Sequence, residues 1–169
     1  MKTISLLTIT SMIVFLTGCC PDNKNKNALS GISEKAFTSG QFEVIADTIT
    51  YDVIIKNPVK EDVWTESCLK HLKRDRLIDV ILEKVKEGTL TAYDYETLRP
   101  LSWTQIDSMK EANNNKMVVG KIQFKELWAF DKDSMRMYKK VHSAIFGYET
   151  YNDDGEVRSY KALFRINFK

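Results

Sequence analysis

The sequence contains little of the side-chain chemistry that most enzymes use. Its 169 residues include two histidines and three cysteines, and neither a His-Glu-x-x-His nor a Cys-x-x-Cys spacing is present. Phosphate-binding glycine loops and the Gly-x-Ser-x-Gly motif of serine hydrolases are also absent. We therefore expect a protein that is not an enzyme and that needs no metal or cofactor.

The chain also lacks an excess of charge of either sign. It carries 25 basic and 23 acidic side chains, for a formal net charge of +2 at pH 7. A nucleic-acid-binding domain normally has a basic stripe and a high pI, so we do not expect nucleic acid as a partner. Its three Trp, seven Tyr and eight Phe can build the core of one domain.

The N-terminus, in contrast, carries a clear signal. Lys2 precedes an apolar run over residues 4–15, followed by Leu16-Thr17-Gly18-Cys19. The run is too short for a transmembrane helix and is typical of a secretory signal. The last four residues resemble the lipobox of bacterial lipoproteins. That resemblance implies cleavage before Cys19, a diacylglyceryl thioether on this cysteine and an N-acyl group, such as palmitate. A plain cleaved signal with an incidental cysteine is the alternative.

These features predict the organisation of the chain. We interpret residues 1–18 as a lipoprotein signal peptide that is removed, 19–40 as the lipidated cysteine with a flexible tether, and 41–169 as one folded domain. Two or three acyl chains on one cysteine would hold the protein permanently on membrane lipid. Whether Cys20 and Cys68 form a disulfide stays open, and we expect Cys68 to be a small buried apolar group.

The first half of the domain shows one strand pattern and two helical patterns. Alternation over residues 42–55 predicts a strand. A helix is expected after it through residues 63–72, with Asn57 as its cap and Pro58 at the first helical position. A second amphipathic helix is predicted over residues 77–85, capped by Asp75 and terminated by Gly88.

The second half reads mainly as strands. A short strand is expected at 89–93 and a helix at 103–112 behind a Ser102 cap, and then alternation predicts strands at 122–130, 135–148 and 160–168. The sequence at 152–155 predicts a hairpin turn. The expected class is α+β: a single domain with an antiparallel β-meander in its C-terminal half and two or three amphipathic helices packed on it.

Aromatic residues and one carboxylate are the candidates for an interface or a ligand pocket. Trp64 and Trp103 lie in amphipathic helices beside charges, where a tryptophan is either an interface hot spot or a core residue. Tyr93 joins them if it is exposed. Trp128 is expected in the core, because its strand alternates regularly.

Glu126 is the candidate polar group, because it shares a strand face with Phe124 and Trp128. A carboxylate on an apolar face can mark a functional site. The alternative is a structural position, at the edge of the sheet or beside a neighbour such as Arg165.

Several segments resemble, in order, the GldN/PorN family of gliding-motility and type IX secretion proteins: residues 61–64, 77–81, 86–94, 128–132, 145–147, 151–156 and 163–166. The resemblance implies a periplasmic protein without catalytic residues that joins a lipoprotein partner in a ring at the outer membrane. The chain departs from the family in carrying its own lipobox and in stopping at an aromatic strand where family chains continue. A lipoprotein paralogue fits these departures better than an orthologue.

Two functions follow as expectations. The first is a membrane-anchored interaction or structural component of an envelope assembly, located at the outer membrane and facing the periplasm, with a protein partner or self-association. The second is a small lipoprotein that binds a small ligand or cell-wall component, or inhibits an enzyme, through a pocket near Glu126.

Overall fold

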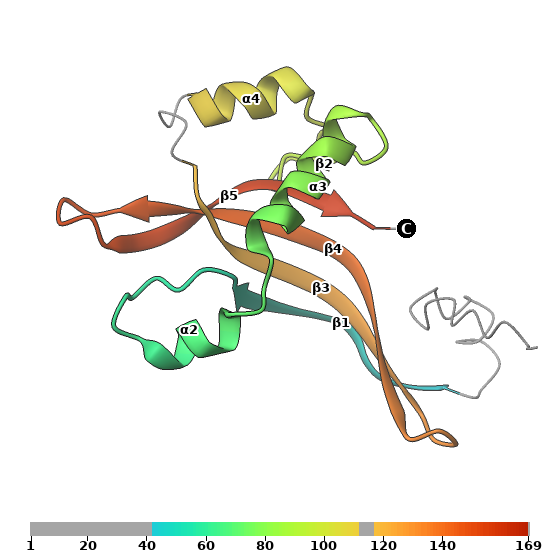
Figure 1. The fold of residues 1–169 in the computed structure, drawn as a ribbon. Coiled ribbons are helices and arrows are strands. Elements are labelled where there is room, and N and C mark those ends of the chain that lie inside the picture. The colour runs from blue at the N-terminus through green and yellow to red at the C-terminus, as the bar shows by residue number, and fades with distance from the viewer. Residues whose placement is uncertain (1–41, 112–116, 169) are drawn as a thin grey trace, which may run out of the picture. The chain divides into compact units, whose positions relative to one another are not determined.

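The computed structural model describes residues 42–111 and 117–168 (Figure 1). The signal peptide, the lipidation of Cys19 and the tether were predicted for residues that lie outside this part. Within it, no helix combines the length and the apolar character needed to span a membrane. The elements in chain order are β1 (Phe42–Ile54), α2 (Val63–Leu69), α3 (Arg74–Lys86), β2 (Ala92–Tyr93), α4 (Trp103–Glu111), β3 (Val119–Asp131), β4 (Arg136–Tyr151) and β5 (Val157–Asn167).

The described strands form one antiparallel sheet in the order β1-β3-β4-β5-β2. The meander of β3, β4 and β5 confirms the prediction for the C-terminal half. The tip between β4 and β5 is the predicted turn, where the Gly155 N–H donates to the Asn152 carbonyl over 3.1 Å. Gly155 has φ +81°, a conformation that glycine adopts without steric cost. Local turn chemistry therefore sets the β4–β5 pairing.

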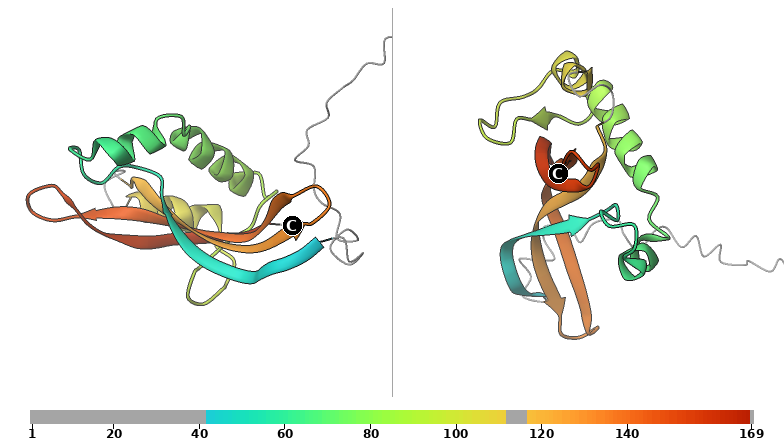
Figure 2. Two further views of the ribbon diagram at one scale, coloured as in Figure 1. Left: turned by 90° about the horizontal axis from the view of Figure 1, so that it is seen from below. Right: turned by 90° about the vertical axis from the view of Figure 1, so that its left-hand side faces the viewer.

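Among the described strands, β1 lies at one edge of the sheet and pairs with β3 alone. Its alternation confirms the predicted strand, because Ile49, Tyr51 and Val53 are half-buried while the residues between them are exposed. The register shifts between Ala46 and Ile49, and Thr48 has φ +64° at that point. Such irregularities bend a strand, and Figure 2 shows β1 curving along its length.

The apolar core joins the sheet to two of the helices. Its buried side chains come from α3 (Ile81 and Val85), from α4 (Ile106) and from the strands, where Ile122, Phe146, Phe164 and Ile166 are at most 2% exposed. α2 contributes no buried residue. Both orientations in Figure 2 place α3 over one face of the sheet. The helical stripe predicted for residues 77–85 thus has its apolar side in the core.

The ends of α3 and α4 agree only partly with the prediction. Gly88 follows α3 with φ +76°, as predicted. Ser102 caps α4 by a reciprocal pair of hydrogen bonds, in which its Oγ accepts from the Gln105 N–H and its own N–H donates to Gln105 Oε1. The Asp75 cap is wrong, because α3 starts at Arg74 and Asp75 lies in its first turn.

The cap predicted for α2 is also wrong. Asp62, rather than Asn57, precedes the helix and accepts hydrogen bonds from the Thr65 N–H and hydroxyl at 3.0 and 2.7 Å. Asn57 instead accepts from the Val59 N–H and donates to the Asp62 carbonyl. It therefore holds the loop that leads to the helix, and Pro58 lies in that loop.

Candidate functional site

The four predicted site residues lie on four different elements. Trp64 is on α2 and 78% exposed, whereas Tyr93 on β2 is half-buried. Trp103 opens α4 and packs against the core, with Lys86 Nζ 5.6 Å from the centre of its ring. Glu126 is buried in β3. The structure therefore does not bring them together in one pocket.

Glu126 sits in an internal cluster of aromatic side chains. The Tyr51 hydroxyl and Trp128 Nε1 both donate to its Oε2 over 2.9 Å. Lys139 Nζ lies 4.3 Å from the centre of the Trp128 ring, a cation–π distance. Burial, together with the hydrogen bond to Glu126, raises the pKa of Tyr51. The two hydrogen bonds of this carboxylate thus come from Tyr51 on β1 and from Trp128 on its own strand, β3.

This arrangement corrects the alternatives expected for Glu126. It is not at the edge of the sheet, because β3 lies between β1 and β4. It is not paired with Arg165, whose Nε donates to Asn167 Oδ1 at 2.9 Å. Trp128 is half-buried rather than in the core, since its indole N–H reaches the carboxylate and its ring meets Lys139.

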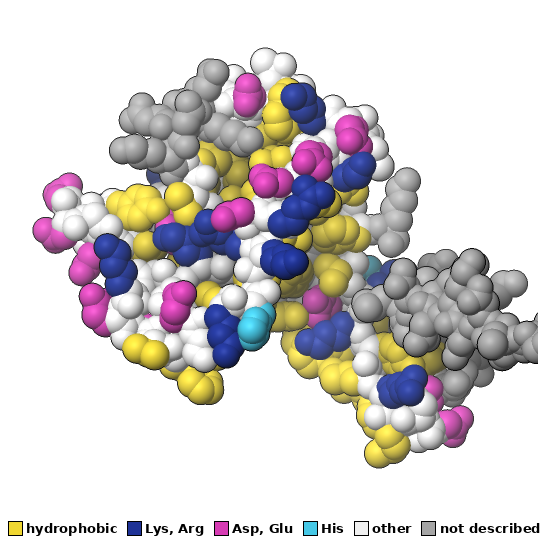
Figure 3. Space-filling model, in the orientation of Figure 1, with side chains coloured by type: hydrophobic (Ala, Val, Ile, Leu, Met, Phe, Trp, Pro, Cys, Tyr) yellow, Lys and Arg dark blue, Asp and Glu magenta, His cyan; other side chains and the backbone are white. Residues whose placement is uncertain are grey.

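One side of α2 presents apolar side chains to solvent. Val63 and Trp64 are 77% and 78% exposed, and Val59 in the preceding loop is also exposed. Ser67 and Cys68 follow on the same side at helical spacing. We call Val63, Trp64, Ser67 and Cys68 the outer face of α2. Figure 3 shows hydrophobic side chains standing out over this helix. Exposed tryptophan is a common anchor of protein interfaces.

Cys68 was predicted to be buried, and that prediction is wrong, because it is exposed on this outer face. The inward positions of the short helix are taken by Thr65 and Leu69. Cys20, with which a disulfide was left open, lies outside the described residues.

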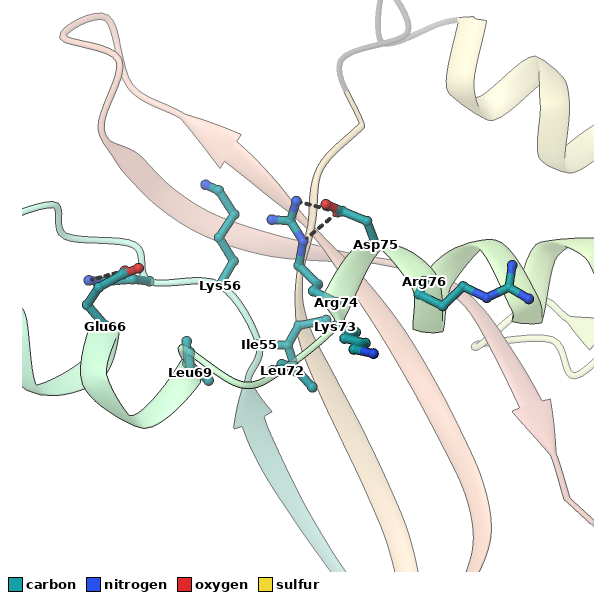
Figure 4. A pocket seen from close by; sticks show the side chains of 10 residues that line it. Ile55, Lys56, Glu66, Leu69, Leu72, Lys73, Arg74, Asp75 and Arg76 are labelled. Carbon is teal, nitrogen blue, oxygen red and sulfur yellow. Dashed lines mark hydrogen bonds and ion pairs between the residues drawn. The ribbon is translucent and has the colours of Figure 1, made fainter.

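A basic recess lies on the other side of α2, between the end of β1 and the start of α3. Its volume is about 460 Å³, within the range of roughly 300–1,000 Å³ typical of ligand pockets. Figure 3 shows Lys and Arg side chains gathered over α3 and the chain before it, and Figure 4 shows the recess itself. The lining consists of Ile55, Lys56, Asn57, Glu66, Leu69, Leu72, Lys73, Arg74, Asp75 and Arg76.

A buried carboxylate stands behind the wall of the basic recess. Glu149 on β4 has a fully buried side chain, and its Oε2 lies 2.6 Å from Lys56 Nζ. The Tyr151 hydroxyl also donates to this oxygen, at 2.5 Å. Burial, the Glu149 hydrogen bond and the nearby carboxylate charge raise the pKa of Tyr151 to about 12. Lys56 is therefore fixed in position by an internal partner.

Sequence reasoning missed both Glu149 and the basic recess. The cationic run over residues 70–76 was visible in the sequence, but such a run is usually a solvated helix face. Lys56 and Glu149 are 93 residues apart, so no local pattern connects them.

In the described ranges, no group of three or more His, Cys, Asp or Glu side chains could hold a metal ion.

No curated protein matches the chain. A family model described as "Gliding motility associated protein GldN" matches residues 51–169, from the last residues of β1 to beyond the end of β5. The chain therefore belongs to the GldN family of gliding-motility-associated proteins.

Proposed function

We propose that the protein is a non-enzymatic component of an envelope assembly that serves gliding motility and type IX secretion. In this proposal it is held by acyl chains on Cys19 at the outer membrane and faces the periplasm. The observation that carries the proposal is the family match over residues 51–169, because it covers most of the chain.

The outer face of α2 is the surface that we propose for contact with a protein of the assembly. A helix of seven residues without a buried side chain adds little to the core, and Val63 and Trp64 are highly exposed. Large apolar side chains displayed together often mark an interaction site. Binding would remove the Trp64 ring from water, which favours association.

A crosslinking pull-down from membranes tests this proposal. The tagged protein is compared with Cys19→Ala, Trp64→Ala and Met137→Ala, the last being an exposed apolar residue on β4 that serves as the matched control. We expect secretion or gliding proteins to be recovered with the unaltered protein and with Met137→Ala. Recovery should fall several-fold without the anchor or without Trp64. Recovery of the monomer alone in every sample would refute the proposal.

The small-ligand alternative loses its main support in the structure. It required Glu126 to converge on an open pocket, whereas Glu126 is 4% exposed and accepts two hydrogen bonds from its neighbours. We therefore do not assign a ligand to this residue.

A further inference from the structure

We propose that the basic recess binds an extended acidic segment of a protein partner, with an aliphatic side chain of that segment on its floor. This inference rests on the proposed function and specifies the chemistry of the partner. It concerns a different side of α2 from the outer face, and it is carried by shape and charge.

The floor of the basic recess is aliphatic. Ile55 at the end of β1 is almost fully buried, Leu69 is half-buried and Leu72 is 41% exposed. In Figure 4 Ile55 and Leu72 lie close together, with Leu69 to one side of them on α2, below the charged ends of Lys56 and Arg74. A concave site with an apolar floor can admit one protruding side chain. A protein segment that carries an apolar side chain between carboxylates matches this combination of an aliphatic floor and a cationic lining.

The lining contains more cations than carboxylates. In the lining, Lys56, Lys73, Arg74 and Arg76 stand against Glu66 and Asp75. Outside the lining, Lys56 is paired with the buried Glu149 and Arg76 with Glu83 on α3. Figure 4 shows Lys56 and Arg74 directing their charged ends to the same side of the recess, while Arg76 extends away along α3. Lys73 and Arg74 are therefore the cations of the recess whose charge can attract an incoming carboxylate.

The cations differ in how far they are already engaged. Lys56 faces the buried Glu149. Arg74 contacts Asp75 Oδ1, but the Asp75 side chain is 81% exposed, and an exposed pair of this kind is weak. Lys73 makes no ion pair among the described residues. An incoming carboxylate can therefore take the place of Asp75 on Arg74 and also reach Lys73.

Asp75 competes with an incoming carboxylate for the Arg74 guanidinium. Substitutions of Arg74 and of Asp75 should therefore change the affinity for an acidic segment in opposite directions. Removing the Arg74 guanidinium should weaken the binding of an acidic segment. Removing the charge of Asp75 should strengthen it, because the guanidinium is then free. Loss of folding would weaken binding in both variants, so opposite effects exclude that explanation.

Fluorescence anisotropy with a labelled Asp-Leu-Glu-Leu-Asp peptide measures these effects on the mature chain. We expect Arg74→Ala to weaken binding about fivefold and Asp75→Asn to strengthen it about threefold, in line with modest single charge pairs. The matched control is Lys125→Ala, an exposed cation on β3 opposite Thr50, and it should bind as the unaltered protein does. An Asn-Leu-Gln-Leu-Asn peptide should bind at least about tenfold more weakly.

Other outcomes overturn the proposal. Equal binding of both peptides, or the same affinity in all variants, would show that the basic recess does not select acidic segments. Binding to phosphatidylglycerol vesicles that depends on Arg74, without peptide binding, would assign the surface to lipid instead.

The membrane pull-down separates this inference from the proposed function. Partner recovery that survives Arg74→Ala overturns the role of the basic recess and leaves the proposed function standing. Peptide binding that depends on Arg74, with no partner recovered by the unaltered protein, supports the acidic-segment site and overturns the proposed function.

Discussion

Gly120 on β3 occupies a position where a single methyl group would collide with buried atoms. A Cβ there would lie 2.6 Å from Glu149 Oε1 and 2.9 Å from Tyr160 Cε1. We expect Gly120→Ala to lower the free energy of unfolding by about 1–3 kcal/mol, the usual cost of overpacking. Urea unfolding followed by circular dichroism measures this change.

Gly147 on β4 provides the matched control. Its nearest atom to an added Cβ is the Lys121 carbonyl oxygen at 3.5 Å, an ordinary contact. Gly147→Ala should therefore change the stability by less than about 1 kcal/mol. A similar loss in both variants would contradict the assignment of the Gly120 effect to the Glu149 contact.

Tyr151 should make the stability depend on pH in the alkaline range. Burial and the hydrogen bond to Glu149 raise its pKa from 10.0 to about 12 in the folded state. Between these values the folded protein keeps a proton that the unfolded chain has released, so stability falls as pH rises through this window. We expect the unfolding midpoint to fall more steeply from pH 10 to 12 in the unaltered protein than in Tyr151→Phe. Tyr138→Phe, which retains Tyr151, should keep the steep slope.

At the same scale, a sequence shows which residues are unusual for their position more readily than it shows which side chains they contact. Glu126 was singled out because it shares a face with Phe124 and Trp128. Its actual partners include Tyr51, which is 75 positions away, and only the β1–β3 register brings them together. Cys68 was misjudged because residue type favours burial, whereas its side of α2 faces solvent.

At the scale of elements, alternation and turn residues predicted the strands well. Side chains on the two faces of β1, β3 and β5 have different surroundings, and this difference appears in the sequence as an alternation of apolar and polar residues. Helix starts were less predictable. Asn57 and Asp62 are both good capping residues for α2, and the one that caps depends on where the loop from β1 enters this helix. Asp75 is also a good capping residue, but α3 begins at Arg74 and includes it.

The Asp62 cap offers a test of this account of α2. The Thr65 hydroxyl and N–H lower the pKa of Asp62 from 3.8, so its carboxylate supports the helix above that value and loses this effect as pH falls through the lowered pKa. We expect Asp62→Ala to speed amide hydrogen exchange at Thr65 and Glu66 at pH 7. Asp79→Ala, at an exposed position of α3, should leave these amides unchanged. Unchanged exchange in Asp62→Ala would mean that α2 is held by other contacts.

At the scale of the whole molecule, the ordered resemblance of short segments predicted the family, and the match over residues 51–169 confirms it. The basic recess could not be predicted in this way, because it combines the end of β1, part of α2 and the start of α3. The lipid anchor remains a prediction from the lipobox. Short segments in a fixed order thus identify the family, whereas a surface such as the basic recess depends on how the helices and strands pack.

The first nine of the thirteen residues of β1, 42–50, should be required for the stability of the domain even though the family match begins at residue 51. Residues 42–50 pair with β3, and Phe42 packs edge-to-face on Tyr138 with 5.3 Å between ring centres. A protein that begins at residue 51 would expose Glu126 and Ala129 on β3, which are now 4% and 0% exposed. We expect it to lose at least about 2 kcal/mol of unfolding free energy relative to one that begins at residue 42, the value of one buried aromatic side chain. Equal unfolding midpoints in urea would show that this part of the strand is dispensable.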